Sequence, residues 1–476
     1  MEPGRRVVLF AGMGVGHLTP MVQLAKLFLR RGFAVTIAVP VRPGPSAAHA
    51  GAPTVAGLAA ANPSISFHLL PPPHHPDPDP IPFVRMIDTL RLCAPSLLEL
   101  LRSLPSVAAL VVDMFCAHAV AVAVAAEASV PAYVYYTSSA GALASNLNLP
   151  YYYSKSDKSL DEMGKALLHF PGVPPVPASD MPAIVKDREG RSYKARAALC
   201  ERLLEASGVL VNTFEWLEAT TVRALREGAC VPDRPTPPVY CIGPLVAGGG
   251  AEEAAGSGRH ACLEWLDAQP ERSVVFLCFG SLGAFSAAQL TEVARGLESS
   301  GHRFLWVVRT PPQDPSKLYE PRPEPELEAL LPEGFLDRTR GRGLVVPSWA
   351  PQAEVLRHAA TGAFVTHCGW NSTLEGVAAG VPLLCWPQYA EQRLNKVLIA
   401  EEMKAGVVME GYDEELVSAG EVEAKVRLVM ESEEGERLRE RLSAAREKAA
   451  EALGDGGSSR LAFDEFLNGL AGSNSK

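Results

Sequence analysis

Residues 363–375 read AFVTHCGWNSTLE, and this stretch determines the fold class that we predict. An apolar run at 363–365 leads through a turn at Gly369 into a helical segment that we expect to start near Ser372. A strand that runs into a helix in this way is the building unit of an α/β fold with a parallel sheet. The free N–H groups at such a helix start suit a phosphate, so we expect an anion site here.

The same alternation of apolar runs and helical patterns extends in both directions along the chain. The runs are continuously apolar, as is typical of parallel strands that are covered on both faces. Two α/β domains, each doubly wound and Rossmann-like, follow from this pattern. The runs are 7–11, 34–39, 65–70, 110–112, 132–136 and 209–211 in the first half, and 274–279, 304–308, 344–346, 363–365, 383–386 and 407–409 in the second half.

Composition changes divide the chain into domains. A stretch rich in proline and glycine separates the two halves, and the tail carries apolar residues at i, i+3, i+4 and i+7 from Phe463, the spacing of an amphipathic helix. We expect that helix to be capped by Ser458 or Ser459 and to pack back on the N-terminal domain. The predicted parts are an N-terminal domain at 1–245, a linker at 246–260, a C-terminal domain at 261–457 and a closing helix at 458–476.

The overall balance of charge and cysteine limits the partners and the compartment. The 476 residues include 44 basic and 54 acidic residues, a formal charge of −10, which disfavours nucleic acid or an anionic membrane as the main partner. The nine cysteines are scattered and never form a C-x-x-C pair, so we expect neither disulfides nor a zinc site. No signal peptide and no membrane-spanning run is apparent. We expect a cytoplasmic monomer with no integral membrane segment.

A glycine-rich loop follows the first apolar run and ends at His17. Its glycines, at 12, 14 and 16, allow a tight turn and place His17 at the carboxyl end of a strand, where it could take a proton from an incoming hydroxyl. Taken alone, His17 has the alternative interpretation of a helix-capping or core histidine. A dinucleotide site is a rival interpretation, but the spacing is G-x-G-x-G and the second strand ends without an acidic residue.

Asp113 ends the apolar run 110–112. A buried carboxylate at a strand end needs a partner, and an imidazole N–H would provide one while fixing the tautomer of the ring. A helix cap or an ion pair with Arg or Lys is an equally open interpretation. A separate Asp-x-Asp pair, Asp77 and Asp79, lies in a proline-rich loop that we expect to be solvated.

Several side chains around residues 349–392 have the chemistry that a nucleotide sugar requires. Trp349 offers an aromatic face for a base, and Glu375 could accept hydrogen bonds from both ribose hydroxyls. Glu391 and Gln392 could bind sugar hydroxyls. Each has a simpler alternative. Trp349 could be a core residue, Glu375 could merely complement the helix dipole, and Glu391 and Gln392 could lie in a solvated loop.

The segment from Trp349 to Gln392 resembles the complete signature box of the plant secondary-product glycosyltransferases, which are members of family 1. Its WAPQ opening, HCGWNS centre and EQ ending carry the resemblance. It implies the two-domain GT-B architecture, with parallel sheets facing across a cleft, and a UDP-sugar donor without a metal or other cofactor. A final glutamine usually accompanies UDP-glucose in this family, so Gln392 favours glucose over galactose.

The resemblance also implies roles for individual residues. His17 would be the catalytic base and Asp113 the residue that orients it. Trp349 would stack on uracil, and Gln352 and Glu375 would hold the ribose. The full donor-binding set that we predict is Thr137, Ser281, Trp349, Ala350, Gln352, His367, Gly369, Trp370, Asn371, Ser372, Glu375, Glu391 and Gln392.

The function implied is that of an inverting UDP-glucose-dependent glucosyltransferase of plant secondary metabolism. We expect it to form β-O-glucosides of small lipophilic acceptors, flavonoids or other phenolics, with C-glucosylation of a phenolic ring as the nearer alternative. A non-catalytic nucleotide-sugar binder and an NAD-dependent oxidoreductase are more distant alternatives. Apolar residues predicted to line the acceptor site are Phe83, Met86, Phe115 and Tyr389.

Overall fold

The computed structural model describes residues 5–41, 54–72, 78–121, 130–247, 259–312 and 322–472. The chain divides into two compact units, which we call the N-terminal and the C-terminal unit. The N-terminal unit comprises residues 1–46, 54–245 and 451–476, and the C-terminal unit comprises 47–53 and 246–450. The chain therefore returns to the N-terminal unit near the end of the long helix α17. Most of the predicted linker, at 246–260, lies outside the described residues.

The N-terminal unit is built on a seven-stranded parallel sheet in the order β3-β2-β1-β4-β5-β8-β9. Its strands are β1 (Arg6–Phe10), β2 (Ala34–Pro40), β3 (Ile65–Leu70), β4 (Val107–Asp113), β5 (Ala132–Tyr136), β8 (Gly208–Val211) and β9 (Val239–Cys241), with a separate hairpin of β6 (Leu167–Leu168) and β7 (Val176–Pro177). Its helices are α1 (Val15–Leu29), α2 (Val55–Ala61), α3 (Pro82–Leu92), α4 (Ala94–Ser103), α6 (Ala140–Ser154), α7 (Arg191–Leu203), α8 (Ala219–Arg226) and α18 (Ser458–Gly472), with short 3₁₀ turns η1 (Met114–Ala119), η2 (Leu160–Met163), η3 (Ala178–Asp180) and η4 (Ala183–Val185).

The C-terminal unit has a six-stranded parallel sheet in the order β12-β11-β10-β13-β14-β15. Its strands are β10 (Val274–Cys278), β11 (Arg303–Val308), β12 (Gly343–Pro347), β13 (Thr361–Thr366), β14 (Leu383–Cys385) and β15 (Gly406–Val408). Its helices are α9 (Ala261–Asp267), α10 (Ala287–Ser300), α11 (Leu327–Leu330), α12 (Phe335–Arg338), α13 (Gln352–Arg357), α14 (Trp370–Ala379), α15 (Gln392–Val397) with the π-turn η6 (Leu398–Glu402), α16 (Ala419–Glu431) and α17 (Glu433–Leu453).

Both sheets are doubly wound, which confirms the predicted fold class. In each unit the first strand lies in the middle, its successor pairs on one side, and the fourth strand pairs on the other. The strand order therefore reverses between β1 and β4 and again between β10 and β13. Ligands of open parallel sheets bind at the carboxyl ends of the strands at such a reversal, so these two edges position the candidate site residues.

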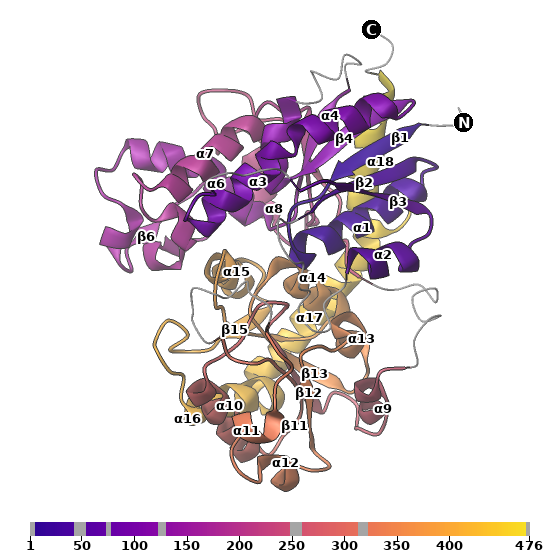
Figure 1. Ribbon diagram of the computed structural model, residues 1–476. Coiled ribbons are helices and arrows are strands. Elements are labelled where there is room, and N and C mark those ends of the chain that lie inside the picture. Colours follow the sequence, from indigo (N-terminus) through magenta and orange to yellow (C-terminus); the bar gives the residue numbers. More distant parts are fainter. Residues whose placement is uncertain are drawn as a thin grey trace. The chain divides into compact units, whose positions relative to one another are not determined.

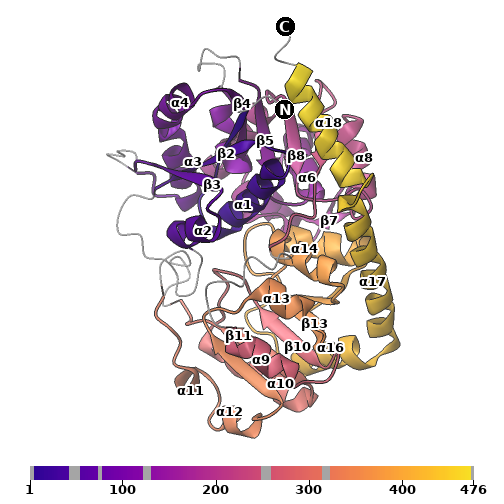
Figure 2. The same ribbon diagram turned by 90° about the vertical axis from the view of Figure 1, so that its right-hand side faces the viewer.

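The closing helix α18 belongs to the core of the N-terminal unit. Phe463 and Phe466 are almost fully buried, and their rings pack edge-on against Phe28 of α1 at 5.1 Å and Tyr133 of β5 at 4.7 Å, respectively. Figures 1 and 2 show α18, in yellow, beside the strands of this unit. A tail that is distant in sequence thus completes the hydrophobic layer over the N-terminal sheet.

Three local features differ from the sequence prediction. Strand β9 and the β6–β7 hairpin were not predicted, because two or three residues give too short an apolar pattern. Helix α14 begins at Trp370 rather than near Ser372, since Gly369 takes the N-cap position. At the start of α18, the hydroxyl of Ser459 donates to the carbonyl of Gly243 at 2.5 Å rather than capping the helix. Among the described residues, no helix is long and apolar enough to cross a membrane.

Candidate active site

The loop after β1 brings His17 close to the end of β4. A Cβ atom on Gly12 would lie 2.5 Å from Asp113 Oδ1, so only glycine lets the carboxylate approach this closely. His17 lies in the first turn of α1 and Asp113 is the last residue of β4. The reversal of strand order between β1 and β4 therefore places an imidazole and a carboxylate side by side.

His17 and Asp113 form a hydrogen-bonded pair. His17 Nδ1 lies 2.8 Å from Asp113 Oδ2, and the backbone N–H of Phe115 donates to Asp113 Oδ1 at 2.9 Å. Asp113 is fully buried, whereas the His17 side chain is 21% exposed. An ionised carboxylate can only accept, so Nδ1 carries the proton and Nε2 keeps its lone pair. The histidine is held in the tautomer that a general base requires.

Thr137 is a third member of this cluster. Its Oγ1 lies 3.1 Å from His17 Nδ1 and donates to Asp113 Oδ2 at 3.3 Å. The family resemblance links Thr137 to the donor sugar, and the sequence pattern gave no indication of this contact with the histidine and the aspartate. We call His17, Asp113 and Thr137 the base cluster.

Aromatic side chains adjoin the base cluster. The ring of Phe115 lies 4.9 Å from that of His17, and Phe83 packs edge-on against Phe115 at 5.8 Å. Met86, one turn from Phe83 on α3, is partly exposed. The guanidinium of Arg196, a buried residue of α7, lies 5.5 Å from the Phe115 ring. The sequence analysis did not identify Arg196. Because Arg196 comes from a helix far along the chain, no local motif could have revealed it.

In the C-terminal unit, helix α14 begins directly after the loop that follows β13. Its N-cap is Gly369, which has no side chain to cap the first turn. This turn carries Trp370, Asn371 and Ser372, and the positive end of the helix dipole here suits an anion. Asn395 Nδ2 donates to the carbonyl of Cys368 at 3.0 Å and so fixes the preceding loop. The sequence analysis did not identify Asn395.

His367 is packed between the two loops that meet at this edge. Cβ atoms on Gly280 or Gly369 would each lie 2.5 Å from His367 Nε2. Burial lowers the pKa of His367 to about 4, a backbone group of Cys278 raises it, and Arg309 lowers it further. The imidazole is therefore neutral at pH 7.

Gln352, Ser372 and Glu375 form a connected polar group beside the start of α14. Gln352 Nε2 donates to Glu375 Oε2 at 2.6 Å and to Ser372 Oγ at 2.9 Å. Burial raises the pKa of Glu375 to about 7, while the hydrogen bond from Gln352 and the charge of Arg357 lower it. The carboxyl group thus changes charge near neutral pH.

The base-stacking candidate, Trp349, lies in the loop after β12. Its side chain is among the few large hydrophobic ones that are exposed, at 38%, and its ring lies 5.8 Å from that of His260. The next residue, Ala350, is buried. An exposed indole held by a neighbouring ring is suited to stacking on a nucleobase.

Gln392 has a fixed orientation. Its Oε1 accepts from the backbone N–H groups of Gln388 and Tyr389, each at 2.9 Å, and the side chain is almost fully buried. The assignment of the amide follows from these two donors, so the NH₂ group is the part that remains for a ligand. Glu391, the N-cap of α15, is partly exposed.

The remaining predicted residues are placed as follows. Ser281 is partly exposed in the loop after β10, whereas Trp370 is buried. Tyr389 belongs to the C-terminal unit, where its ring lies 6.5 Å from that of His367, whereas Phe83 and Phe115 belong to the N-terminal unit. Asp79 of the Asp-x-Asp pair is buried, accepts from the N–H of Ile81 at 2.9 Å and pairs with Arg191, while Asp77 lies outside the described residues.

Known proteins share this architecture and sequence. The family model for UDP-glucoronosyl and UDP-glucosyl transferase matches residues 225–444. Anthocyanidin 5,3-O-glucosyltransferase of a Rosa hybrid cultivar is 41% identical over 472 residues, which cover 96% of this chain and 97% of that protein. The chain belongs to the UDP-glycosyltransferase family. It is therefore an enzyme of the hexosyltransferase class.

Further relatives agree with this assignment. Phloretin 2'-O-glucosyltransferase of Pyrus communis is 41% identical to this UDP-glycosyltransferase over 485 residues, which cover 98% of this chain and all of that one. The structure of Phytolacca americana UGT2 complexed with UDP-2fluoro-glucose and pterostilbene superimposes with a TM-score of 0.84 at 34% identity, covering 98% of this chain and 100% of that one. The predicted GT-B class is confirmed.

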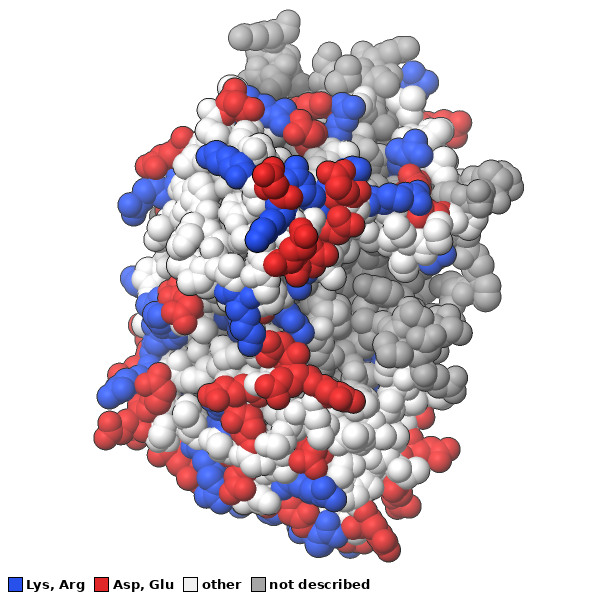
Figure 3. Space-filling view, turned by 90° about the vertical axis from the view of Figure 1, so that its left-hand side faces the viewer, with Lys and Arg blue, Asp and Glu red and all other residues white. Residues whose placement is uncertain are grey.

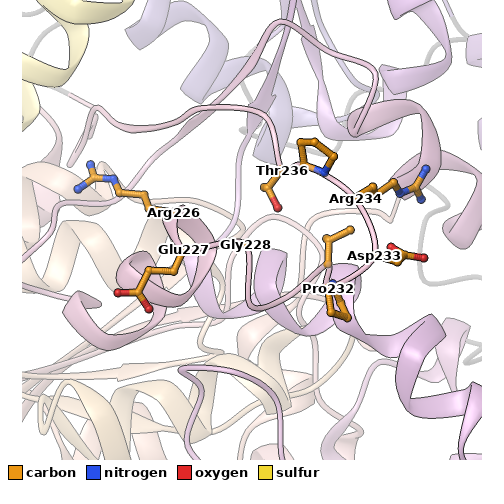
Figure 4. Close-up of a pocket in the computed structure, with 9 residues that line it drawn as sticks. Arg226, Glu227, Gly228, Pro232, Asp233, Arg234 and Thr236 are labelled. Atoms are coloured by element: carbon orange, nitrogen blue, oxygen red, sulfur yellow. The ribbon is translucent and has the colours of Figure 1, made fainter.

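One surface hollow of the UDP-glycosyltransferase lies away from all these residues. About 510 Å³ in volume, it is lined by residues 226–228 and 231–236 of the N-terminal unit. Figure 4 shows the charged ends of Arg226, Asp233 and Arg234 pointing away from its centre. Arg226 pairs with Glu215, and Arg234 pairs with Glu201 at 2.6 Å. Both of its arginines are thus paired with neighbouring carboxylates, and we assign no ligand to it.

Proposed function

We propose that this enzyme transfers glucose from UDP-glucose to a hydroxyl group of a small phenolic acceptor, forming a β-O-glucoside with inversion. The observation that carries the proposal is the 2.8 Å hydrogen bond between His17 Nδ1 and Asp113 Oδ2. That bond orients the partly exposed imidazole of His17 at the carboxyl edge of the N-terminal sheet, where its Nε2 would act as the base. The helix dipole at the N-terminus of α14, where the N-cap is a glycine, supports the donor half of the proposal.

The proposed reaction moves one proton and one glucosyl group. His17 Nε2 takes the proton of the acceptor hydroxyl as its oxygen attacks the anomeric carbon from the face opposite UDP. The bond from that carbon to the β-phosphate oxygen breaks, and UDP leaves with the bonding electrons. Asp113 stabilises the imidazolium that forms. A general base in this role contributes roughly 10²–10⁴-fold to the rate.

The leaving diphosphate would be held by the first turn of α14, with Asn371 and Ser372 as side-chain donors and His367 as a neutral donor. Fixed donors and a helix dipole aimed at a developing negative charge stabilise it without a cation. We therefore propose that turnover needs no added metal and persists in EDTA. Gln392 would donate its NH₂ group to a sugar hydroxyl, since its oxygen is already occupied.

The acceptor class follows from what adjoins the base. Phe115 and Phe83 provide aromatic surface next to His17, which favours a flat aromatic acceptor. Relatives named for anthocyanidin and phloretin, together with a neighbour that contains pterostilbene, support a phenolic acceptor.

Two further parts of the proposal are a cytosolic location, supported by nine unpaired cysteines, and a monomeric state. Charged residues of both signs are interspersed on the face in Figure 3, without a continuous basic patch for nucleic acid.

The test is UDP release by the purified chain with UDP-glucose, EDTA and a panel of flavonoids, simple phenols and terpenoid alcohols. We expect acceptor-dependent release and a product that is heavier by one hexosyl unit, labile to acid and β-configured by NMR. An acid-stable product would establish C-glucosylation instead. Tight UDP-glucose binding without turnover of any acceptor would favour a non-catalytic binder, and loss of activity in EDTA would overturn the metal-free mechanism.

A further inference from the structure

The first turn of helix α6 is capped by a carboxylate from a distant part of the chain. Glu218 Oε2 accepts from the backbone N–H of Ala140 at 3.0 Å, and Oε1 accepts from that of Gly141 at 2.9 Å. Ser139 Oγ accepts from the N–H of Ala142 at 3.0 Å. Three N–H groups that a helix start leaves without helical partners are therefore bound by side chains. Two side chains, those of Glu218 and Ser139, thus cap the N-terminus of α6.

Glu218 makes these bonds away from solvent. The residue is fully buried, at the end of the segment that follows β8. An isolated carboxylate is costly to bury, but two N–H donors and the positive end of a helix dipole offset that cost. Burial raises the pKa of Glu218, whereas the side chain of Thr213 and the N–H groups of Gly141 and Ala140 lower it. A carboxylate in this setting fixes the position of the turn that it binds.

That turn begins directly after the base cluster. Thr137 is separated from Ala140 by two residues, Ser138 and Ser139, both of which are buried. Pairing in strand β5 fixes the chain before Thr137, and the hydrogen bond to Glu218 fixes it at Ala140. The 3.1 Å contact of Thr137 Oγ1 with His17 therefore depends on both anchors.

We propose that Glu218 is a positioning residue for the transfer reaction: by fixing the first turn of α6 it holds Thr137 against His17 and Asp113. The inference rests on the proposed function, in which His17 is the base. Glu218 touches neither substrate, so its effect falls on the chemical step rather than on binding of the donor. Displacement of a reacting group by about 1 Å can cost on the order of 10²-fold in rate.

The test is a double-mutant cycle of Glu218→Gln and Thr137→Val in the full-length chain. The glutamine keeps one carbonyl oxygen but turns an NH₂ group toward a backbone N–H. We expect kcat to fall about 10- to 100-fold while the KM for UDP-glucose stays unchanged. In the Thr137→Val background the same substitution should add little, because the contact through which it acts is already gone.

A matched control separates positioning from loss of structure. Gln289 of the C-terminal unit is also buried, and its amide makes two hydrogen bonds, at 2.9 and 2.8 Å, with the backbone of Val417. Gln289→Leu should lower the thermal midpoint and leave kcat near the wild-type value. If Glu218→Gln folds poorly, Ser139→Ala can replace it, because it removes the third cap bond of the same turn. Ser139→Ala should give a smaller loss of kcat, and no further loss in the Thr137→Val background.

A spectroscopic signal tests the inference without turnover. The His17 Nδ1 proton, hydrogen-bonded to Asp113, should give a far-downfield ¹H resonance that is absent in His17→Ala. We expect Glu218→Gln to shift or broaden it and Gln289→Leu to leave it in place. An unaltered resonance together with wild-type kcat, or losses of kcat that simply add in the cycle, would overturn the inference. Absence of turnover in the wild type would instead count against the proposed function, since the resonance is measured independently.

Discussion

Asp113 and His367 occupy equivalent positions in the two parallel sheets. Asp113 comes directly after Val112, which pairs with Phe10 at the end of β1. His367 comes directly after Thr366, which pairs with Cys278 at the end of β10. Each therefore projects at the reversal of strand order, where open parallel sheets bind their ligands.

In both units a glycine leaves room for the side chain at this position. Gly12 and Gly280 each come two residues after the end of the first strand, and a Cβ on either would lie 2.5 Å from the side chain of Asp113 or His367, respectively. In one unit the position holds a carboxylate that binds an imidazole. In the other it holds a neutral imidazole. In the proposed mechanism, this shared position would supply an acceptor for a cationic base in one unit and a donor for an anionic leaving group in the other.

Asp113→Asn should lower kcat by about 10²–10⁴-fold with little change in the KM for UDP-glucose. The amide no longer requires Nδ1 to carry the proton and does not stabilise the imidazolium. Steady-state kinetics with a phenolic acceptor would measure the change. Asp79→Asn is the matched control, because Asp79 also accepts from the N–H two residues ahead at 2.9 Å. Equal losses in the two variants would contradict the role of Asp113.

Uridine should bind more tightly as the pH rises through about 7. In the proposed donor site, ribose hydroxyls would donate to the Glu375 carboxylate, whereas burial raises the pKa of that group to about 7 in the free protein. Below that pH the group is protonated and must lose its proton on binding, so affinity at pH 6 should be about tenfold lower than at pH 8. His367, with a pKa of about 4, does not titrate in this window. Calorimetry with uridine avoids the titration of a phosphate, and an unchanged slope in Glu375→Gln would contradict this account.

Phe466→Ala should destabilise the N-terminal unit by about 3–5 kcal/mol, because it removes a fully buried ring from the layer formed with Phe28 and Tyr133. Urea denaturation followed by circular dichroism would measure the shift. Leu461→Ala on the same helix removes a side chain that is 56% exposed and should change the stability by less than about 0.5 kcal/mol. A wild-type midpoint for Phe466→Ala would show that α18 does not stabilise this unit.

The sequence predicted the architecture because the strands of both sheets are continuous apolar runs, and such runs have a local signal. His17, Asp113 and His367 were found for a related reason: Asp113 ends an apolar run, and His17 and His367 each follow one. Strand β9, with only three residues, has no comparable pattern.

The supporting contacts could not be predicted, because they join residues far apart in the chain. Glu218 is 78 residues from Ala140, and its hydrogen bond has no local pattern. Arg196 reaches Tyr136 OH, 60 residues away, at 2.9 Å. The contact of Thr137 with His17 spans 120 residues. Only the folded sheet brings these groups together.

The most direct test of the central claim compares the wild type with His17→Ala, in both turnover of a phenolic acceptor with UDP-glucose and calorimetric binding of UDP. His17 is proposed to act only on the acceptor proton, so turnover should fall at least about 10²-fold while UDP affinity stays near that of the wild type. Preserved turnover in His17→Ala would contradict the assignment of the base, and with it the proposed mechanism.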